Sequence, residues 1–310
     1  MDITKRKRAD SALLSPSAKM KEALEPPSRI IPYLFLLPAM AVFALFSYLP
    51  FLKTIAMSFS ITDNRGQIKK LVGLLNYTEL LGSPEFRETL LTTLKFVPMI
   101  FFPTLLLGLF LACLAEKKLK FFSPISETLF ALPMAVASAS AAVVWKMLFN
   151  PSSGALNYLL GTDISWLADK NWALISVALV TVWLQTGITF IFLVTGLRGV
   201  PAELAESASI DGCGPLRTFF HIKLPMISPT LFFVVFLNIT TSFQTFGQIR
   251  LLTQGGPGSS TTVLVYQIYQ EAFMNKRYGS AGAMSIILFL LMLCITLIQF
   301  RFEKKGVFYG

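Results

Sequence analysis

The residues of this chain that could do acid–base or nucleophilic chemistry are few and poorly placed for it. The 310 residues include one histidine, His221, and three cysteines, whose spacing does not suit a metal ion. Three carboxylates, Glu203, Glu206 and Asp211, lie near one another in the sequence, but no histidine or cysteine is placed to act with them. We expect a solvated helix surface there, with neither a catalytic nor a metal site.

A nucleotide-binding motif is missing too. The phosphate-binding pattern GxxxxGK[ST] does not occur, and the glycine-rich stretch GGPGSS at 255–260 has no lysine to hold a phosphate. We therefore expect no cofactor in this chain, and any nucleotide that drives its work must be bound by another polypeptide.

The chain is too apolar for an ordinary soluble protein. Hydrophobic residues make up 54% of it, charged residues make up 14%, and its mean hydropathy is +0.63. The lipid bilayer is its expected surroundings. The 27 Lys and Arg exceed the 17 Asp and Glu, and in so apolar a chain this excess is expected to fix orientation in the membrane and not to bind nucleic acid.

Six stretches are long enough, or nearly so, to cross the hydrocarbon core as a helix, which takes about 20 apolar residues. Residues 1–29 are instead polar, basic and proline-containing, with too few apolar residues to fold. The sequence predicts an all-α polytopic membrane protein, with a basic cytosolic tail at 1–29 and a six-helix transmembrane domain at 30–310. The expected spans are 30–51, 90–114, 126–148, 172–197, 227–249 and 281–300.

Basic residues gather against the helix ends on one side of the expected membrane. They are densest in the tail, after the second span, in the loop after the fourth span and near the C-terminus. Because Lys and Arg beside helix ends favour the cytosolic side, we expect both termini inside the cell. The loop at 198–226 is then cytosolic as well.

The loop at 198–226 has an unusual sequence for a connection between two spans. Pro201 suits the start of a short helix, and Asp211 followed by Gly212 permits a sharp turn. A second short helix is expected at 216–222, and it should expose an aromatic pair. Exposed apolar groups in the cytosol need a partner, so the pattern predicts a docking element. The aromatic pair is Phe219 and Phe220.

This loop resembles the signature loop of the membrane subunits of binding-protein-dependent ABC importers. That signature runs Glu-Ala-Ala, three residues, Gly, nine residues, Ile, one residue and Leu-Pro. Every spacing is kept here, and the single departure is a serine for the first alanine, a small residue that should still fit. The matching residues are Glu206, Ser207, Ala208, Gly212, Ile222, Leu224 and Pro225.

The resemblance extends from about residue 30 to the C-terminus. Stretches such as PYLFLLPA in the first expected span and GGPGSSTTVLVYQIYQEAF before the last are similar to the carbohydrate-uptake branch of these permeases. Within that branch, the chain is most similar to the first permease subunit of sn-glycerol-3-phosphate importers, and next to the permeases for di- and oligosaccharides.

The resemblance implies a MetI-like ABC importer permease fold in the bacterial cytoplasmic membrane. The working unit would also contain a second permease subunit, a dimer of ATPase subunits that bind ATP and Mg²⁺, and an extracytoplasmic solute-binding protein. The loop would couple to the ATPase, so this chain would not itself be an enzyme. Glu206 would contact the ATPase or the loop's own backbone, Gly212 would make the bend, and Phe219 and Phe220 would either anchor the ATPase or pack beneath the membrane.

A transport path should be lined by polar residues in otherwise apolar helices, since such residues are costly in lipid. Aromatic side chains beside them can stack on sugar rings. Hydrogen bonding between helices explains any one of the polar residues equally well, so glycerol phosphate and a neutral saccharide stay open as solutes. The candidates are Gln185, Asn238, Thr241, Phe243 and Gln244.

Two other kinds of protein fit part of the pattern. A stand-alone secondary carrier or channel would explain six spans, but such a protein usually has ionisable residues at mid-membrane, and none is found in the expected spans. A membrane scaffold or receptor would use the loop to recruit a signalling protein, and would transport nothing.

Overall fold

The computed structural model describes residues 31–116 and 124–306. By its internal contacts the chain divides into two units, Met1–Lys53 and Thr54–Gly310, and each is described by itself. The predicted basic tail at 1–29 lies outside the described residues, as do the lysines that follow the second expected span.

The first described helix contains a widened turn whose position follows from a proline. It runs as α3 (Ile31–Phe43), the π-helical turn η1 (Ala44–Tyr48) and α4 (Leu49–Ser58). Leu49 donates its backbone N–H to Ala44, five residues back. The next residue, Pro50, has no N–H and its ring crowds the carbonyl four residues back, which the wider turn accommodates.

After the end of α4, the second unit contains a β-hairpin that the sequence analysis missed. Strands β1 (Ser60–Thr62) and β2 (Ile68–Leu71) pair antiparallel, with Ser60 opposite Leu71. Asp63 closes the turn, because its Oδ1 accepts the backbone N–H groups of residues 65 and 67. These two bonds favour the ionised carboxylate and hold the pKa of Asp63 below its usual value.

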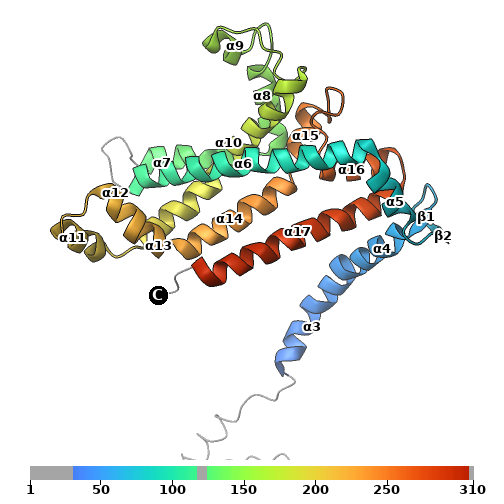
Figure 1. Cartoon of the computed structure of the whole chain (residues 1–310), viewed down its shortest axis with the longest axis horizontal. Helices are drawn as coiled ribbons and strands as arrows, with labels where there is room; N and C mark the ends of the chain where they lie inside the picture. Colours follow the sequence, from blue (N-terminus) through green and yellow to red (C-terminus); the bar gives the residue numbers. More distant parts are fainter. Residues whose placement is uncertain (1–30, 117–123, 307–310) are drawn as a thin grey trace, which may run out of the picture. The chain divides into compact units, whose positions relative to one another are not determined.

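Four long helices make up the body of the second unit. They are α6 (Pro84–Glu116), α10 (Lys170–Arg198), α14 (Ser228–Phe243) and α17 (Tyr278–Gly306). Helix α6 packs along α10, and α14 lies against α6, α10 and α17 (Figure 1).

Helices α6 and α10 approach closely at one glycine. A Cβ atom on Gly108 of α6 would lie 2.4 Å from Cγ2 of Thr189 on α10, far inside van der Waals contact. Small residues at such crossings let membrane helices pack backbone to backbone. The pair α6 and α10 therefore forms a closely packed centre of the bundle.

The third expected span, 126–148, is not a single helix. It consists of α7 (Pro124–Ala131), the 3₁₀ turn η2 (Leu132–Ala135) and α8 (Ser138–Leu148), and the two halves meet at an angle of 107°. A proline at 133 and two extended residues, Val136 and Ala137, separate the halves. By length and composition, the described residues contain five helices able to cross a membrane, or six if this bent pair is one crossing.

The fifth expected span, 227–249, is also interrupted. Helix α14 stops at Phe243, Gln244 has a non-helical backbone, and α15 (Gly247–Leu252) follows. The remaining short helical elements are α5 (Leu75–Gly82), α9 (Ala155–Leu160), α16 (Leu264–Tyr269) and the π-helical turn η4 (Gln270–Met274).

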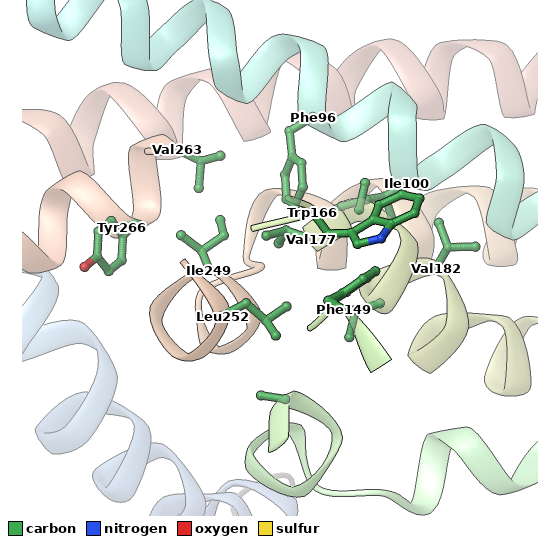
Figure 2. Close-up of a cluster of buried hydrophobic side chains, with 13 residues drawn as sticks. Phe96, Ile100, Phe149, Trp166, Val177, Val182, Ile249, Leu252, Val263 and Tyr266 are labelled. Carbon is green, nitrogen blue, oxygen red and sulfur yellow. The ribbon is translucent and has the colours of Figure 1, made fainter. Parts of the chain in front are cut away.

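One hydrophobic core joins several of the short elements to the long helices α6 and α10. Side chains from α6, α8, α10, α15 and α16 meet in it, with Phe149 and Trp166 packed as tilted rings 5.7 Å apart (Figure 2). Ile100 and Val177 are fully buried there. This core lies at the middle of α6 and the first half of α10, whereas the loop at 198–226 lies at the C-terminal ends of both helices (Figure 1).

Candidate functional site

The loop at 198–226 begins with a short helix, as the sequence predicts. Helix α11 (Ala202–Ile210) starts directly after Pro201, and Glu203 lies in its first turn. Acidic residues there interact favourably with the positive end of the helix dipole. Ala208 is buried, whereas Glu206 and Ser207 are exposed.

A glycine with a left-handed backbone ends this helix and makes the bend. Gly212 has φ +76°, and its N–H donates to the carbonyl of Ser209. The backbone N–H of Cys213 donates to the carbonyl of Ala208, five residues earlier, which is a 6→1 hydrogen bond at the end of the helix. This pair of bonds is the Schellman arrangement, in which the left-handed position favours glycine. A Cβ on Gly212 would meet nothing within 4 Å, so the backbone angle and not space demands glycine.

The second helix is longer than the expected 216–222 and contains a π-helical turn. It runs through α12 (Pro215–Thr218), the turn η3 (Phe219–Lys223) and α13 (Leu224–Met226). Leu224 donates to the carbonyl of Phe219, and Pro225 follows it. The same sequence of a π turn, leucine and proline occurs at η1 and Pro50, so the Leu-Pro pair of the motif again accompanies a widened turn.

One face of the loop packs against the long helices. Phe219 and Leu224 contact a core that includes Ala115 of α6 and Leu197 of α10. Phe219 is half-buried, so the expectation that the second helix exposes both aromatics is wrong for Phe219. A ring at this position lies on the inner side of the short helix and is covered by the bundle, which the local sequence alone does not reveal.

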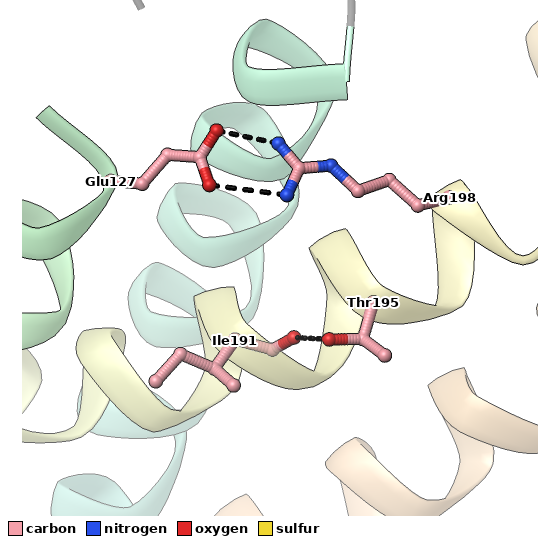
Figure 3. A network of polar contacts seen from close by, with 4 residues as sticks. All are labelled: Glu127, Ile191, Thr195 and Arg198. Carbon is pink, nitrogen blue, oxygen red and sulfur yellow. Dashed lines mark hydrogen bonds and ion pairs between the residues drawn. The ribbon is translucent and has the colours of Figure 1, made fainter. Parts of the chain in front are cut away.

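Two ion pairs fix the ends of the loop to the bundle. Lys223 Nζ donates to Glu116 Oε1, at the last residue of α6, and about four-fifths of each side chain is buried. Arg198, the last residue of α10, makes two parallel hydrogen bonds to the carboxylate of Glu127 on α7 (Figure 3). Such two-pronged pairs fix geometry as well as charge.

The opposite face of the loop exposes apolar side chains. Ile210 is 87% exposed, Leu216 74% and Phe220 57%. The sequence analysis did not single out Ile210 and Leu216 as exposed apolar residues of the loop. Their position beside the two glycines at 212 and 214 was a usable signal, because a sharp turn presents its flanking residues to solvent.

The remaining motif residues differ in their surroundings. Ile222 is half-buried and Pro225 is exposed. Within the described part of the chain, the Glu206 carboxylate makes no hydrogen bond or ion pair, so contact with the loop's own backbone does not occupy it. His221 is exposed, and its Nδ1 lies 3.1 Å from the carbonyl oxygen of Arg217.

A groove of about 550 Å³ separates the loop from the last turns of α6. Leu106 and Phe110 line it from α6, Leu216 and Phe220 line it from the loop, and the Glu116–Lys223 ion pair borders it. The groove makes one side of the loop accessible along its length.

The polar residues expected along a transport path have unlike surroundings. Asn238 is buried and exchanges hydrogen bonds of 3.1 and 3.2 Å with Thr189 of α10, which is the interhelical role left open above. Gln185 has a buried Oε1 that lacks a hydrogen-bond partner among the described residues. Thr241 bonds to carbonyls of its own helix, Phe243 is buried and Gln244 is exposed.

No group of three or more His, Cys, Asp or Glu in the described ranges is arranged to hold a metal ion. Arg250, near the end of the bundle away from the loop, stacks on the ring of Tyr269 with 4.6 Å from the guanidinium carbon to the ring centroid. This arrangement occupies one face of the guanidinium.

A bundle of apolar helices long enough to cross a membrane, with a loop that is packed on one face and exposes apolar side chains on the other, is consistent with a membrane permease subunit. Residues 104–306 match the family of binding-protein-dependent transport system inner membrane components, and the chain belongs to this family. The match includes the whole loop at 198–226.

Similar proteins of established name share most of the chain's length. The sn-glycerol-3-phosphate transport system permease protein UgpA of Pectobacterium atrosepticum is 38% identical over 283 residues, which are 90% of this chain and 96% of that protein. The UgpA protein of Agrobacterium fabrum is 35% identical over 288 residues, 92% of this chain and 98% of that protein.

Solved structures support the fold. A chain of a bacterial alginate ABC transporter in complex with a pentasaccharide-bound periplasmic protein superposes with a TM-score of 0.79 at 22% identity, covering 90% of this chain and 96% of that one. A chain of the MetNI methionine ABC transporter superposes with a TM-score of 0.52 at 15% identity, covering 72% and 97%. The expected MetI-like permease fold is confirmed.

Proposed function

We propose that this chain is the permease subunit of an ABC importer whose loop at 198–226 docks on a cytosolic ATPase and is moved by it. The observation that carries the proposal is the two-sided construction of the loop. Its inner face is packed and ion-paired to α6, while Ile210 and Leu216 on the other face are exposed. A loop that only connected two spans would need neither feature.

The construction suits the transmission of movement. Lys223 is paired to the last residue of α6, and Arg198 joins α10 to α7. A displacement of the loop tip would therefore pass to three helices at once, because each is held by packing or charge and not by a slack connection. A bundle of this kind changes between discrete arrangements more readily than it deforms.

The other components follow from the proposal. A dimer of ATPase subunits would bind ATP and Mg²⁺, a second permease subunit would complete the membrane path, and a solute-binding protein would deliver solute from outside. The family description, which refers to binding proteins, supports the last of these. The complex of an alginate transporter with a periplasmic protein offers a structural parallel.

The proposed solute is a carbohydrate or a sugar phosphate. The relatives named for sn-glycerol-3-phosphate, at 35 to 38% identity over nine-tenths of the chain, support this class. The proposed location is the bacterial cytoplasmic membrane, with both termini inside the cell, since that orientation places the loop beside a cytosolic ATPase.

The proposal can be tested by reconstituting this chain with its second permease and ATPase in proteoliposomes. Uptake of radiolabelled sn-glycerol-3-phosphate and of maltooligosaccharides would be measured in the presence of the solute-binding protein, with and without ATP. We expect ATP-dependent uptake of one of the two classes. Uptake that proceeds unchanged without ATP, driven by an ion gradient, would contradict the proposal and favour a secondary carrier.

A further inference from the structure

A small polar pocket lies at the end of the bundle away from the loop. It has a volume of about 140 Å³ and is formed where α5, the start of α6, α16 with η4, and the start of α17 meet. We call it the Gln267–Glu271 pocket after its two most buried polar residues. Gln267 is 5% exposed and Glu271 is 9% exposed.

Both residues line this pocket, and each has a side-chain oxygen without a hydrogen-bond partner in the described part of the chain. Gln267 Oε1 and Glu271 Oε2 are buried and accept no hydrogen bond from any described residue. The other carboxylate oxygen, Glu271 Oε1, accepts a bond of 2.7 Å from Asn275 Nδ2. Buried acceptors without donors cost free energy, so the pocket is built to receive a donor, and the carboxylate favours one with positive charge.

The one basic residue among those lining the pocket does not fill that role. Arg277 Nη1 lies 3.7 Å from Glu271 Oε2, beyond hydrogen-bonding distance, and the Arg277 side chain is 70% exposed. Two further carboxylates, Glu79 and Glu85, line the pocket and are exposed, so they stand at its mouth. The mouth and the floor therefore both carry negative charge.

The size of the pocket indicates what enters it. Since one water takes about 30 Å³ of liquid volume, the space equals about five waters. A bare metal ion would leave most of it empty, and the described residues hold no cluster of three acidic, histidine or cysteine ligands. An ammonium or guanidinium group with part of its aliphatic stem fits both the volume and the charge.

The position of the pocket indicates the source of that group. The pocket lies at the first turn of α6 and the loop at its last. The 33 residues of α6 extend about 50 Å at about 1.5 Å per residue, enough to cross a bilayer. If the loop meets a cytosolic ATPase, the pocket faces outside, where the solute-binding protein arrives.

We propose that the Gln267–Glu271 pocket receives a Lys or Arg side chain of the extracytoplasmic solute-binding protein when it docks. The proposal rests on the proposed function, and it adds a specific contact that holds the binding protein on the permease. Arg277 competes for Glu271 in the undocked state and must release it for the incoming group. Arg277 therefore weakens docking, whereas Glu271 strengthens it.

The test uses the complete transporter in proteoliposomes, titrated with the purified solute-binding protein of the same transport system. The readout is the binding-protein concentration that gives half-maximal stimulation of ATP hydrolysis, together with the maximal rate. Glu271→Gln keeps the shape of the side chain and the oxygen that accepts from Asn275. We expect this variant to raise the half-maximal concentration about tenfold or more, with the maximal rate unchanged.

Arg277→Ala gives the outcome that separates docking from simple stabilisation. We expect the half-maximal concentration to fall about threefold, because the competing cation is gone. If the Arg277–Glu271 contact only stabilised the fold, both variants would shift in the same direction, and that result would overturn the proposal. Glu88→Gln, an exposed glutamate on α6 that does not line the pocket, is the matched control and should behave as wild type.

Three further outcomes identify failures of different kinds. If the chelator EGTA changes the wild-type titration as Glu271→Gln does, a metal ion fills the pocket and the proposal is wrong. If wild type and Glu271→Gln are stimulated equally, the pocket proposal alone fails. If the binding protein does not stimulate even the wild type, the proposed function fails together with it.

Discussion

Lys223 of the loop at 198–226 donates to the carboxylate of Glu116, the last residue of α6, across a separation of 107 positions in the sequence. Lys223 is the one variable position between the fixed Ile222 and Leu224 of the signature motif. The π-helical turn that ends at this residue lies where the helix meets Pro225. The pair therefore connects the docking loop to a helix that extends through the whole bundle.

Breaking this ion pair is expected to uncouple transport. Both side chains of the pair are about four-fifths buried, and removing one partner of a partly buried pair costs about 2 kcal/mol or more. Lys223→Gln should therefore reduce ATP-dependent uptake at least fivefold, while the ATPase still associates. Uptake and ATP hydrolysis would be measured in the same proteoliposomes.

The charge reversal is the control for this prediction. Glu116→Lys combined with Lys223→Glu should recover part of the uptake that either single change loses. Uptake in the double variant that is no better than in the singles would mean that the pair does not carry the coupling.

The two glycines of the loop should respond differently to the same substitution. Gly212→Ala places a side chain at φ +76° and should cost about 1 kcal/mol of loop stability. Gly214→Ala is its matched control, since Gly214 has φ −67° and neither glycine has an atom within 4 Å of an added Cβ. Gly212→Val should uncouple uptake from hydrolysis, while Gly214→Val transports normally. Equal effects at both sites would contradict the bend at Gly212.

Substitutions at the exposed apolar residues of the loop should weaken binding to the ATPase, whereas substitution of the half-buried Phe219 should lower the stability of the fold. Three variants each remove an exposed apolar group: Ile210→Ser, Leu216→Ser and Phe220→Ala. Each should lower the yield of ATPase in co-purification and leave thermal unfolding of the chain unchanged. Phe219→Ala should instead lower the unfolding midpoint, because Phe219 packs on the bundle. A full ATPase yield from the Leu216→Ser variant would remove this residue from the interface.

Asn238 and Thr189 provide a test of the expected transport path. Their mutual hydrogen bonds join α14 to α10, so Asn238→Ala and Thr189→Val should each destabilise the bundle by about 0.6 kcal/mol and show coupling in the double variant. Additive effects on stability, accompanied by a change in which solute is transported, would instead favour a direct role of Asn238 in the path.

The sequence predicted best those features whose cause is local. The bend needs a residue that tolerates positive φ, and Gly212 occupies that place. The helix α11 also begins directly after Pro201. Each of these follows from the chemistry of one residue and its immediate neighbours.

Features that depend on the bundle were harder to predict. Whether Phe219 or Phe220 faces the solvent is decided by α6 and α10, which are distant in sequence. The break in the third expected span places Val136 and Ala137 in an extended conformation inside an apolar run that hydropathy treats as continuous. The ion-pair partner of Lys223 could not be predicted, since nothing in the sequence spacing singles out Glu116.

Photo-crosslinking from Leu216 tests the central claim most directly. With p-benzoylphenylalanine at this position and the ATPase co-expressed, illumination of inverted membrane vesicles should join the chain to the ATPase subunit. The same label at Tyr158, which is 88% exposed on α9, well away from the loop at 198–226, should give no such product (Figure 1). A crosslink from Leu216 to the solute-binding protein or to another extracytoplasmic protein, with none to the ATPase, would contradict the account.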